Sequence, residues 1–130
     1  MTILTVDDDI EDQEIFNEAL SIIDPLIVCL KANNGIEGYD VLLKDNTYLS
    51  LDYIFLDINM PKMTGIELLL LIMKNERLKN IPVYMLSTSC SESELKKINS
   101  LGATMIQKQS QFSLNIQMLR SIIKPKPVVR

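Results

Sequence analysis

The sequence predicts an α/β protein in which a five-stranded parallel sheet is covered on both faces by five helices. Two observations predict this fold class. Five short apolar runs alternate with five longer stretches whose apolar residues recur at helical spacing. The connections between these stretches are also short, which suits parallel strands joined by helical crossovers. At 130 residues, 47% of them hydrophobic, the chain is long enough to bury a sizeable core within one domain.

The first half of the chain contains two of the expected strands and two helices. Residues 3–6 form an apolar run that stops at Asp7-Asp8-Asp9. The apolar face of the helix that follows consists of Ile15, Phe16, Ala19, Leu20 and Ile23. A proline ends this helix, and residues 26–30 are expected to form a second buried strand. The Asn-Asn-Gly turn at residues 33–35 then precedes a short helix that reaches about Leu43.

The central strand is predicted at residues 53–56, a run of β-branched and aromatic side chains that stops at Asp57. Pro61 and Gly65 mark an irregular loop after it, and residues 66–73 begin a leucine-rich helix. In open parallel sheets, ligands gather outside the carboxyl ends of the strands. Asp57 is therefore a candidate functional residue, although a lone aspartate in this position more often only caps a turn.

The fourth strand is predicted at residues 82–86, and it ends at Ser87. Ser91 and Glu94 have the spacing of a capping box at the start of the next helix, which Gly102 ends.

The fifth strand is predicted at residues 103–107 and is followed directly by Lys108. A last helix stops before Pro125, and its apolar stripe consists of Phe112, Ile116, Leu119 and Ile123. Residues 125–130 form a short basic tail that prolines interrupt, and a frayed end is expected there.

A flavodoxin-like doubly wound sheet with strand order 2-1-3-4-5 suits this length best. In that order the first and third strands are neighbours, so Asp7, Asp8 and Asp57 converge at one end of the sheet. Ser87 and Lys108, at the ends of the fourth and fifth strands, are expected to line the other side of the same site.

This group of side chains suits phosphoryl transfer. Three carboxylates so close together repel one another, and a hard divalent cation such as Mg²⁺ removes the conflict. Lys108 supplies a fixed positive charge, and Ser87 supplies a hydroxyl that can donate to a phosphoryl oxygen. Phosphoryl transfer needs little beyond positioning and neutralisation of charge. Asp57, which is central, is the natural nucleophile and would form an aspartyl-phosphate.

The composition excludes several classes of function. There is no histidine, which removes histidine-dependent triads, histidine metal sites and histidine kinase chemistry. The net charge of −4 argues against a nucleic-acid-binding surface, and no apolar stretch is long enough to span a membrane. No signal peptide is evident, and Cys29 and Cys90 are isolated thiols, so a cytoplasmic, reducing compartment is expected.

The chain resembles the receiver domain of two-component response regulators over residues 1–124, and the remaining residues are the tail. The acid pair Asp7-Asp8, the segment LDINMPKMTG around Asp57, Ser87 and Lys108 carry the resemblance. It implies that Asp57 accepts a phosphoryl group from a phosphohistidine on a sensor histidine kinase or phosphotransfer protein. Such a protein is not a conventional enzyme, because it catalyses its own Mg²⁺-dependent phosphorylation and autodephosphorylation.

The resemblance also implies roles for individual residues. The ligands of Mg²⁺ are then Asp8, Asp57, the backbone carbonyl of Asn59 and, through water, Asp7. Ser87 binds one phosphoryl oxygen, and Lys108 pairs with the carboxylate or the phosphoryl group.

Three departures from the family's pattern concern its conformational switch rather than its chemistry. Gln109 stands where a proline, commonly with a cis bond, usually follows the lysine. A cis bond before a non-proline residue costs about 3–4 kcal/mol, so a trans bond is predicted. Met105 stands where tyrosine or phenylalanine is usual, and the segment from Gly102 to Lys108 is one residue shorter than is common. A graded response is therefore predicted.

No output domain is expected after the receiver, so signalling through contact with a downstream target protein is expected, as in stand-alone chemotaxis-type regulators. The main alternative is a receiver-like interaction module that is never phosphorylated. A small Mg²⁺-dependent phosphatase with an aspartate nucleophile is a further alternative, but a second acid and a cap are not evident. A flavin-binding flavodoxin is disfavoured, because no phosphate-binding loop rich in Ser, Thr and Gly follows the first strand.

Overall fold

The computed structural model describes residues 1–123 and contains one parallel sheet with strand order β2-β1-β3-β4-β5. This is the flavodoxin-like order predicted above. β1 is hydrogen-bonded to both β2 and β3, so the third strand lies next to the first. The strands are β1 Thr2–Val6, β2 Val28–Ala32, β3 Leu51–Asp57, β4 Val83–Ser87 and β5 Thr104–Gln107.

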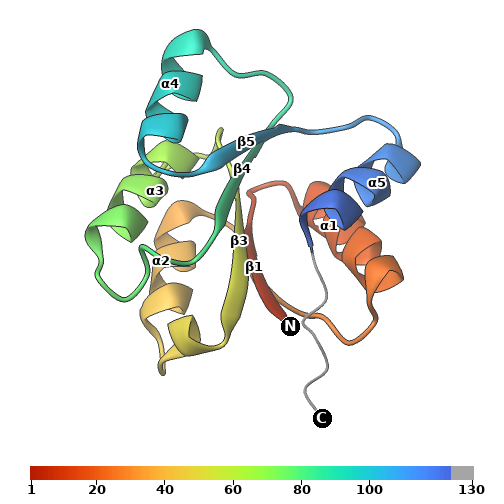
Figure 1. Ribbon diagram of the computed structural model, residues 1–130, viewed down its shortest axis with the longest axis horizontal. Coiled ribbons are helices and arrows are strands. Elements are labelled where there is room, and N and C mark those ends of the chain that lie inside the picture. Colours follow the sequence, from red (N-terminus) through yellow and green to blue (C-terminus); the bar gives the residue numbers. More distant parts are fainter. Residues whose placement is uncertain (124–130) are drawn as a thin grey trace.

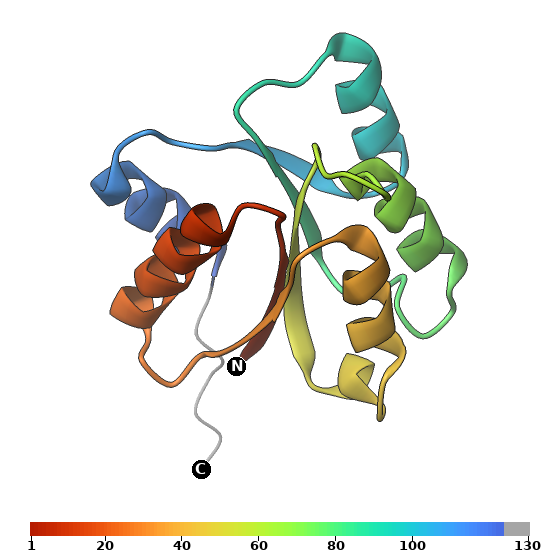
Figure 2. The same cartoon turned by 180° about the vertical axis from the view of Figure 1, so that it is seen from behind.

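Five α-helices connect the strands and cover both faces of the sheet. Figures 1 and 2 show α1 and α5 side by side on one face, and α2, α3 and α4 on the other. The helices are α1 Ile10–Ile23, α2 Gly35–Leu43, α3 Gly65–Lys74, α4 Glu92–Ser100 and α5 Phe112–Ile122, and a short 3₁₀ helix covers Thr47–Leu49. None of the helices within residues 1–123 is long and apolar enough to cross a membrane.

Alternating side chains of the strands build two separate cores. In β3, Ile54 and Leu56 are fully buried beneath α2, α3 and α4, whereas Phe55 is buried beneath α1 and α5. This follows from the two-residue period of a strand, which sends neighbouring side chains to opposite faces. β3 is thus apolar on both faces and lies at the centre of the sheet, and this fixes where its last residue, Asp57, emerges.

The helix starts follow local capping rules. Ser91 and Glu94 form the predicted capping box at α4, and Thr64 with Glu67 forms a second one at α3. Asp9 accepts from the backbone N–H of Asp12 at the start of α1.

The second strand differs from the prediction in position and burial. It covers Val28–Ala32 rather than residues 26–30, and it lies at the edge of the sheet. Leu26 lies in the turn before the strand and is 80% exposed, and Val28, the first residue of this edge strand, is 54% exposed. Some predicted helix-face residues, such as Ile15 and Leu43, are likewise exposed. The basic tail lies outside the described residues.

Candidate functional site

Three carboxylates meet at the carboxyl ends of β1 and β3. The two strands are paired in register up to Val6 and Leu56, so Asp57 and the residues after Val6 leave the sheet together. One oxygen each of Asp7, Asp8 and Asp57 lies within 4.8 Å of the other two. Asp7 and Asp57 are buried and Asp8 is exposed, so the cluster is open to solvent on one side.

The buried side chain of Gln13 fixes the end of β1. Its amide nitrogen donates to the backbone carbonyl of Asp7 at 2.8 Å and to that of Ala32, at the end of β2, at 2.5 Å. The carboxylate of Asp7 in turn accepts from the backbone N–H of Asp9 at 3.0 Å. Gln13 therefore holds the backbone of Asp7, and Asp9, the N-cap residue of α1, holds its carboxylate.

Gly65 fixes the end of β3. Its backbone N–H donates to the carbonyl of Ile58 at 3.0 Å, which closes the loop between β3 and α3. A Cβ atom at residue 65 would overlap the backbone carbonyl of Asp57. The close approach of α3 to Asp57 therefore requires glycine at this position.

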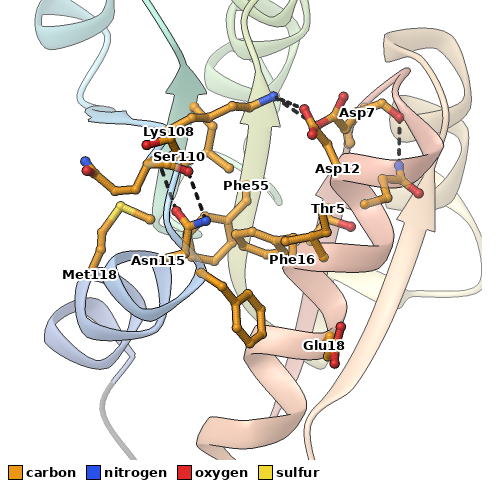
Figure 3. Close-up of a pocket in the computed structure, with 16 residues that line it drawn as sticks. Thr5, Asp7, Asp12, Phe16, Glu18, Phe55, Lys108, Ser110, Asn115 and Met118 are labelled. Atoms are coloured by element: carbon orange, nitrogen blue, oxygen red, sulfur yellow. Dashed lines mark hydrogen bonds and ion pairs between the residues drawn. The ribbon is translucent and has the colours of Figure 1, made fainter.

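Lys108 brings the end of β5 to the acids. Its backbone N–H donates to the carbonyl of Ser87 at 2.9 Å, which aligns it with β4. Its Nζ lies 3.2 Å from an oxygen of Asp7, 3.1 Å from one of Asp12 and 3.5 Å from one of Asp57. Figure 3 shows the ammonium group reaching across to Asp7 and Asp12. The lysine thus joins the end of the sheet to α1.

Burial and charge shift the pKa values of these groups. Burial, only partly offset by Lys108, raises the pKa of Asp57 to about 6. Burial also raises the pKa of Asp7. For Lys108, burial disfavours the charged form, but Asp7, Asp12 and Asp57 outweigh it and raise the pKa of the ammonium. Four acids, Asp7, Asp8, Asp12 and Asp57, surround this one ammonium group, so the negative charge of the site exceeds what Lys108 alone can balance.

Ser87 is buried beside the acids but is turned toward its own loop. Its hydroxyl donates to the backbone carbonyl of Ser89 at 2.5 Å. It accepts from the side-chain amide of Asn59 at 3.5 Å. To donate to a group on Asp57, the hydroxyl has to leave the Ser89 carbonyl.

Besides Gln13, two further polar residues of the site were not predicted from the sequence. Asp12 pairs with Lys108, and a signal existed, since an acid in the first turn of the helix after β1 lies near the carboxyl end of the sheet. Asn115 of α5 holds the loop after Lys108: it accepts from the backbone N–H of Gln109 and donates to its carbonyl, both at 3.2 Å. No sequence pattern marks Asn115. No peptide bond within residues 1–123 is cis, so the predicted trans bond between Lys108 and Gln109 is confirmed.

A cleft of about 460 Å³ lies between α1 and α5, next to the acids. Phe16 and Phe55 form part of its apolar wall, and Lys108 and Asp12 lie at its polar end (Figure 3). The cleft therefore opens one side of Lys108 to solvent.

Comparisons with known proteins agree with this fold and site. A family model described as "Response regulator receiver domain" matches residues 3–120, so the chain belongs to this family. A protein-glutamate methylesterase/protein-glutamine glutaminase of Pyrococcus abyssi is 28% identical over 125 residues, which are 95% of this chain and 33% of that protein. The chain thus spans about a third of the length of this relative and of its Pyrococcus horikoshii counterpart.

Two solved structures are similar over most of both chains. The phosphorylated cyanobacterial phytochrome response regulator RcpA is 30% identical with a TM-score of 0.82, covering 93% of this chain and 89% of that one. The Mn²⁺-bound form of response regulator Rcp1 is 27% identical with a TM-score of 0.79, covering 93% and 90%. The chain is therefore a two-component receiver domain with an acidic site of the kind that holds a divalent metal.

Proposed function

We propose that this receiver domain accepts a phosphoryl group on Asp57 from a phosphohistidine of a sensor histidine kinase or phosphotransfer protein. One observation carries the proposal. Asp57 ends the central strand beside the acids Asp7 and Asp8, and the ammonium of Lys108 lies 3.5 Å from its carboxylate. A carboxylate nucleophile next to both a cation site and a fixed positive charge is what transfer of a phosphoryl group requires.

The three carboxylates fit a bound Mg²⁺. Three oxygen ligands within 4.8 Å of one another, one of them on an exposed residue, suit a hard cation that keeps some of its waters. Burial raises the pKa of Asp57 to about 6, and the charges of Asp7 and Asp8 add to the rise, so a cation on the cluster would stabilise the charged carboxylate. The ligands we assign are Asp8, Asp57 and the backbone carbonyl of Asn59, with Asp7 acting through water. When bound, Mg²⁺ would neutralise charge on the transferring phosphoryl group.

The transfer itself exchanges one bond for another. A carboxylate oxygen of Asp57 attacks phosphorus, the bond from phosphorus to the donor's imidazole nitrogen breaks, and its electron pair stays on that nitrogen. Lys108 is placed to pair with a phosphoryl oxygen, because its Nζ is already 3.5 Å from Asp57. Ser87 can turn from the Ser89 carbonyl to donate to another. In autodephosphorylation, water attacks phosphorus and the bond from phosphorus to the Asp57 oxygen breaks. Inorganic phosphate is released, and the Asp57 carboxylate is restored.

Intact mass spectrometry after incubation with acetyl phosphate tests this function. The protein should gain the mass of one phosphoryl group with Mg²⁺ and none with excess chelator. Asp57→Asn should abolish the adduct, and Asp8→Asn should slow its formation. Asp40→Asn, which removes an exposed acid on α2, is the matched control and should leave it unchanged. An undiminished adduct in the Asp57→Asn protein would contradict the assignment.

The output is proposed to be contact with a target protein that differs between the phosphorylated and unphosphorylated states, in the cytoplasm. A pull-down with both forms of the protein measures it. A chain that takes up no phosphoryl group yet captures the same protein would instead be a receiver-like interaction module. Turnover of general phosphate esters would identify a phosphatase.

A further inference from the structure

Asp12 is in direct contact with the functional lysine but lies outside the acid cluster that suits a metal. That cluster consists of Asp7, Asp8 and Asp57. Asp12 belongs to the first turn of α1, where its backbone N–H is held by the side chain of Asp9. Its carboxylate accepts from Nζ of Lys108 at 3.1 Å, and its side chain is 45% exposed (Figure 3). The helix cap therefore places this carboxylate over the lysine.

The distances show which acids hold the ammonium group. Nζ of Lys108 donates to Asp12 and to Asp7, at 3.1 and 3.2 Å, while the nearest oxygen of Asp57 is 3.5 Å away. Lys108 is thus drawn toward α1. A divalent cation on the acid cluster would compete with Lys108 for the charge of Asp7 and Asp57. Asp12 would then be the acid most available to the ammonium group.

We infer that Asp12 is a positioning residue that competes with the phosphoryl group on Asp57 for Lys108. The inference rests on the proposed function. The ion pair between Asp12 and Lys108 forms in the resting protein and weakens when the phosphoryl group arrives. It therefore stabilises the starting state and raises the barrier to transfer. Asp12 thereby sets how readily Asp57 is phosphorylated, without touching the reacting atoms.

The expected effect is modest because the pair is partly exposed. Asp12→Asn keeps the size and the helical position of the side chain but removes its charge. We expect phosphorylation by acetyl phosphate to become about two- to fivefold faster, which is the range for a partly exposed ion pair. Glu11→Gln is the matched control, since it removes an exposed acid from the same helical turn.

Removal of any acid near the site also reduces repulsion of the anionic donor, and a double-mutant cycle separates the two effects. If Asp12 acts through Lys108, Asp12→Asn should change the rate only where Lys108 is present and should have no effect in a Lys108→Ala background. If the effect is general repulsion, the increase should persist in that background and should also occur with Glu11→Gln.

A crystal structure of the Asp12→Asn protein supplies a second measurement that needs no phosphoryl transfer. Nζ of Lys108 is expected closer to Asp57 than the present 3.5 Å. If Lys108 does not move, or if Asp12→Asn accelerates phosphorylation equally in the Lys108→Ala background, this inference is overturned while the proposed function stands. A wild-type protein that takes up no phosphoryl group overturns the proposed function and this inference with it.

Discussion

The side-chain amide of Asn115 makes hydrogen bonds to both the N–H and the carbonyl of Gln109, each at 3.2 Å. This pairing ties α5 to the loop that begins at Lys108. A proline at residue 109 has no N–H to donate, so the hydrogen bond to Oδ1 of Asn115 requires a residue other than proline there. Asn115 thus supplies a restraint on the loop in a chain that lacks the proline usual at this position.

Asn115→Ala should loosen this loop. Two partly buried neutral hydrogen bonds are lost, and we expect the free energy of unfolding to fall by about 1–2 kcal/mol. The amide of Gln109 should exchange with solvent much faster, and hydrogen exchange measured by NMR reports this directly. Gln111→Ala is the control, because that exposed side chain makes no capping hydrogen bond. Unchanged protection at Gln109 would show that the pairing does not restrain the loop.

The positions of the three acids could be predicted from the sequence because they depend on simple rules. Asp7, Asp8 and Asp57 follow apolar runs, and parallel strands in the order 2-1-3-4-5 place their ends at one edge. Asp12 and Asn115 lie on helices, and which neighbour a helical side chain reaches depends on how the helix is turned against the sheet. The predicted strand order already placed the second strand at the edge, but an apolar run does not show which of its side chains a helix covers, so the exposure of β2 was missed.

Asp57→Asn should stabilise the metal-free protein at neutral pH. Burial raises the pKa of Asp57 from 3.8 to about 6 in the folded state, so the folded protein binds this proton more tightly than the unfolded chain does. The stabilisation from this proton is complete below about pH 4 and is lost as the pH rises through about 6. We expect a gain of about 1–2 kcal/mol in unfolding free energy at neutral pH.

Urea unfolding in excess chelator, at pH values on either side of this range, measures the effect. Asp57→Asn should reduce the fall in stability with rising pH, and Asp40→Asn should not. Part of the fall should remain in Asp57→Asn, because burial also raises the pKa of Asp7. An identical pH dependence in the Asp57→Asn protein and the wild type would count against a raised pKa at Asp57.

Gly65→Ala should disturb the phosphoacceptor itself. The new methyl group would overlap the carbonyl of Asp57, so either β3 or the start of α3 must move. We expect a loss of about 1–3 kcal/mol in stability, as for other overpacked sites, together with slower phosphorylation by acetyl phosphate.

Gly102→Ala is the control for a general loss of stability. Gly102 has a φ of +85°, which strains an alanine, but no atom lies within 4 Å of the added methyl group. This variant should lose stability yet keep the wild-type phosphorylation rate at a temperature where both proteins are folded. Slowing of equal size in both variants would mean that stability, not the position of Asp57, sets the rate.

Met105 should make the response to phosphorylation graded. It lies in β5 opposite Met85, is half-buried, and packs against the core beneath α4. A phosphoryl group adds about −1.5 to −2 charges, and Ser87 can move toward it and pull on the loop before α4. Methionine is flexible enough to pack in both the unphosphorylated and the phosphorylated conformation without a sharp preference for either. A shift of the two populations from 1:99 to 99:1 needs about 5.5 kcal/mol of differential stabilisation, to which such a side chain contributes little.

Amide chemical shifts with Mg²⁺, with and without a beryllofluoride mimic of the phosphoryl group, measure this response. For residues 91–101 and 104–123, which form the expected partner surface, the mimic should move the chemical shifts only part of the way from the values of the unphosphorylated conformation to those of the phosphorylated one. Met105→Tyr restores an aromatic ring and should move these shifts further toward the second state, because a ring packs well in fewer orientations than a methionine does. Changes confined to the surroundings of Asp7, Asp57 and Ser87 would show that the phosphoryl signal does not reach β5.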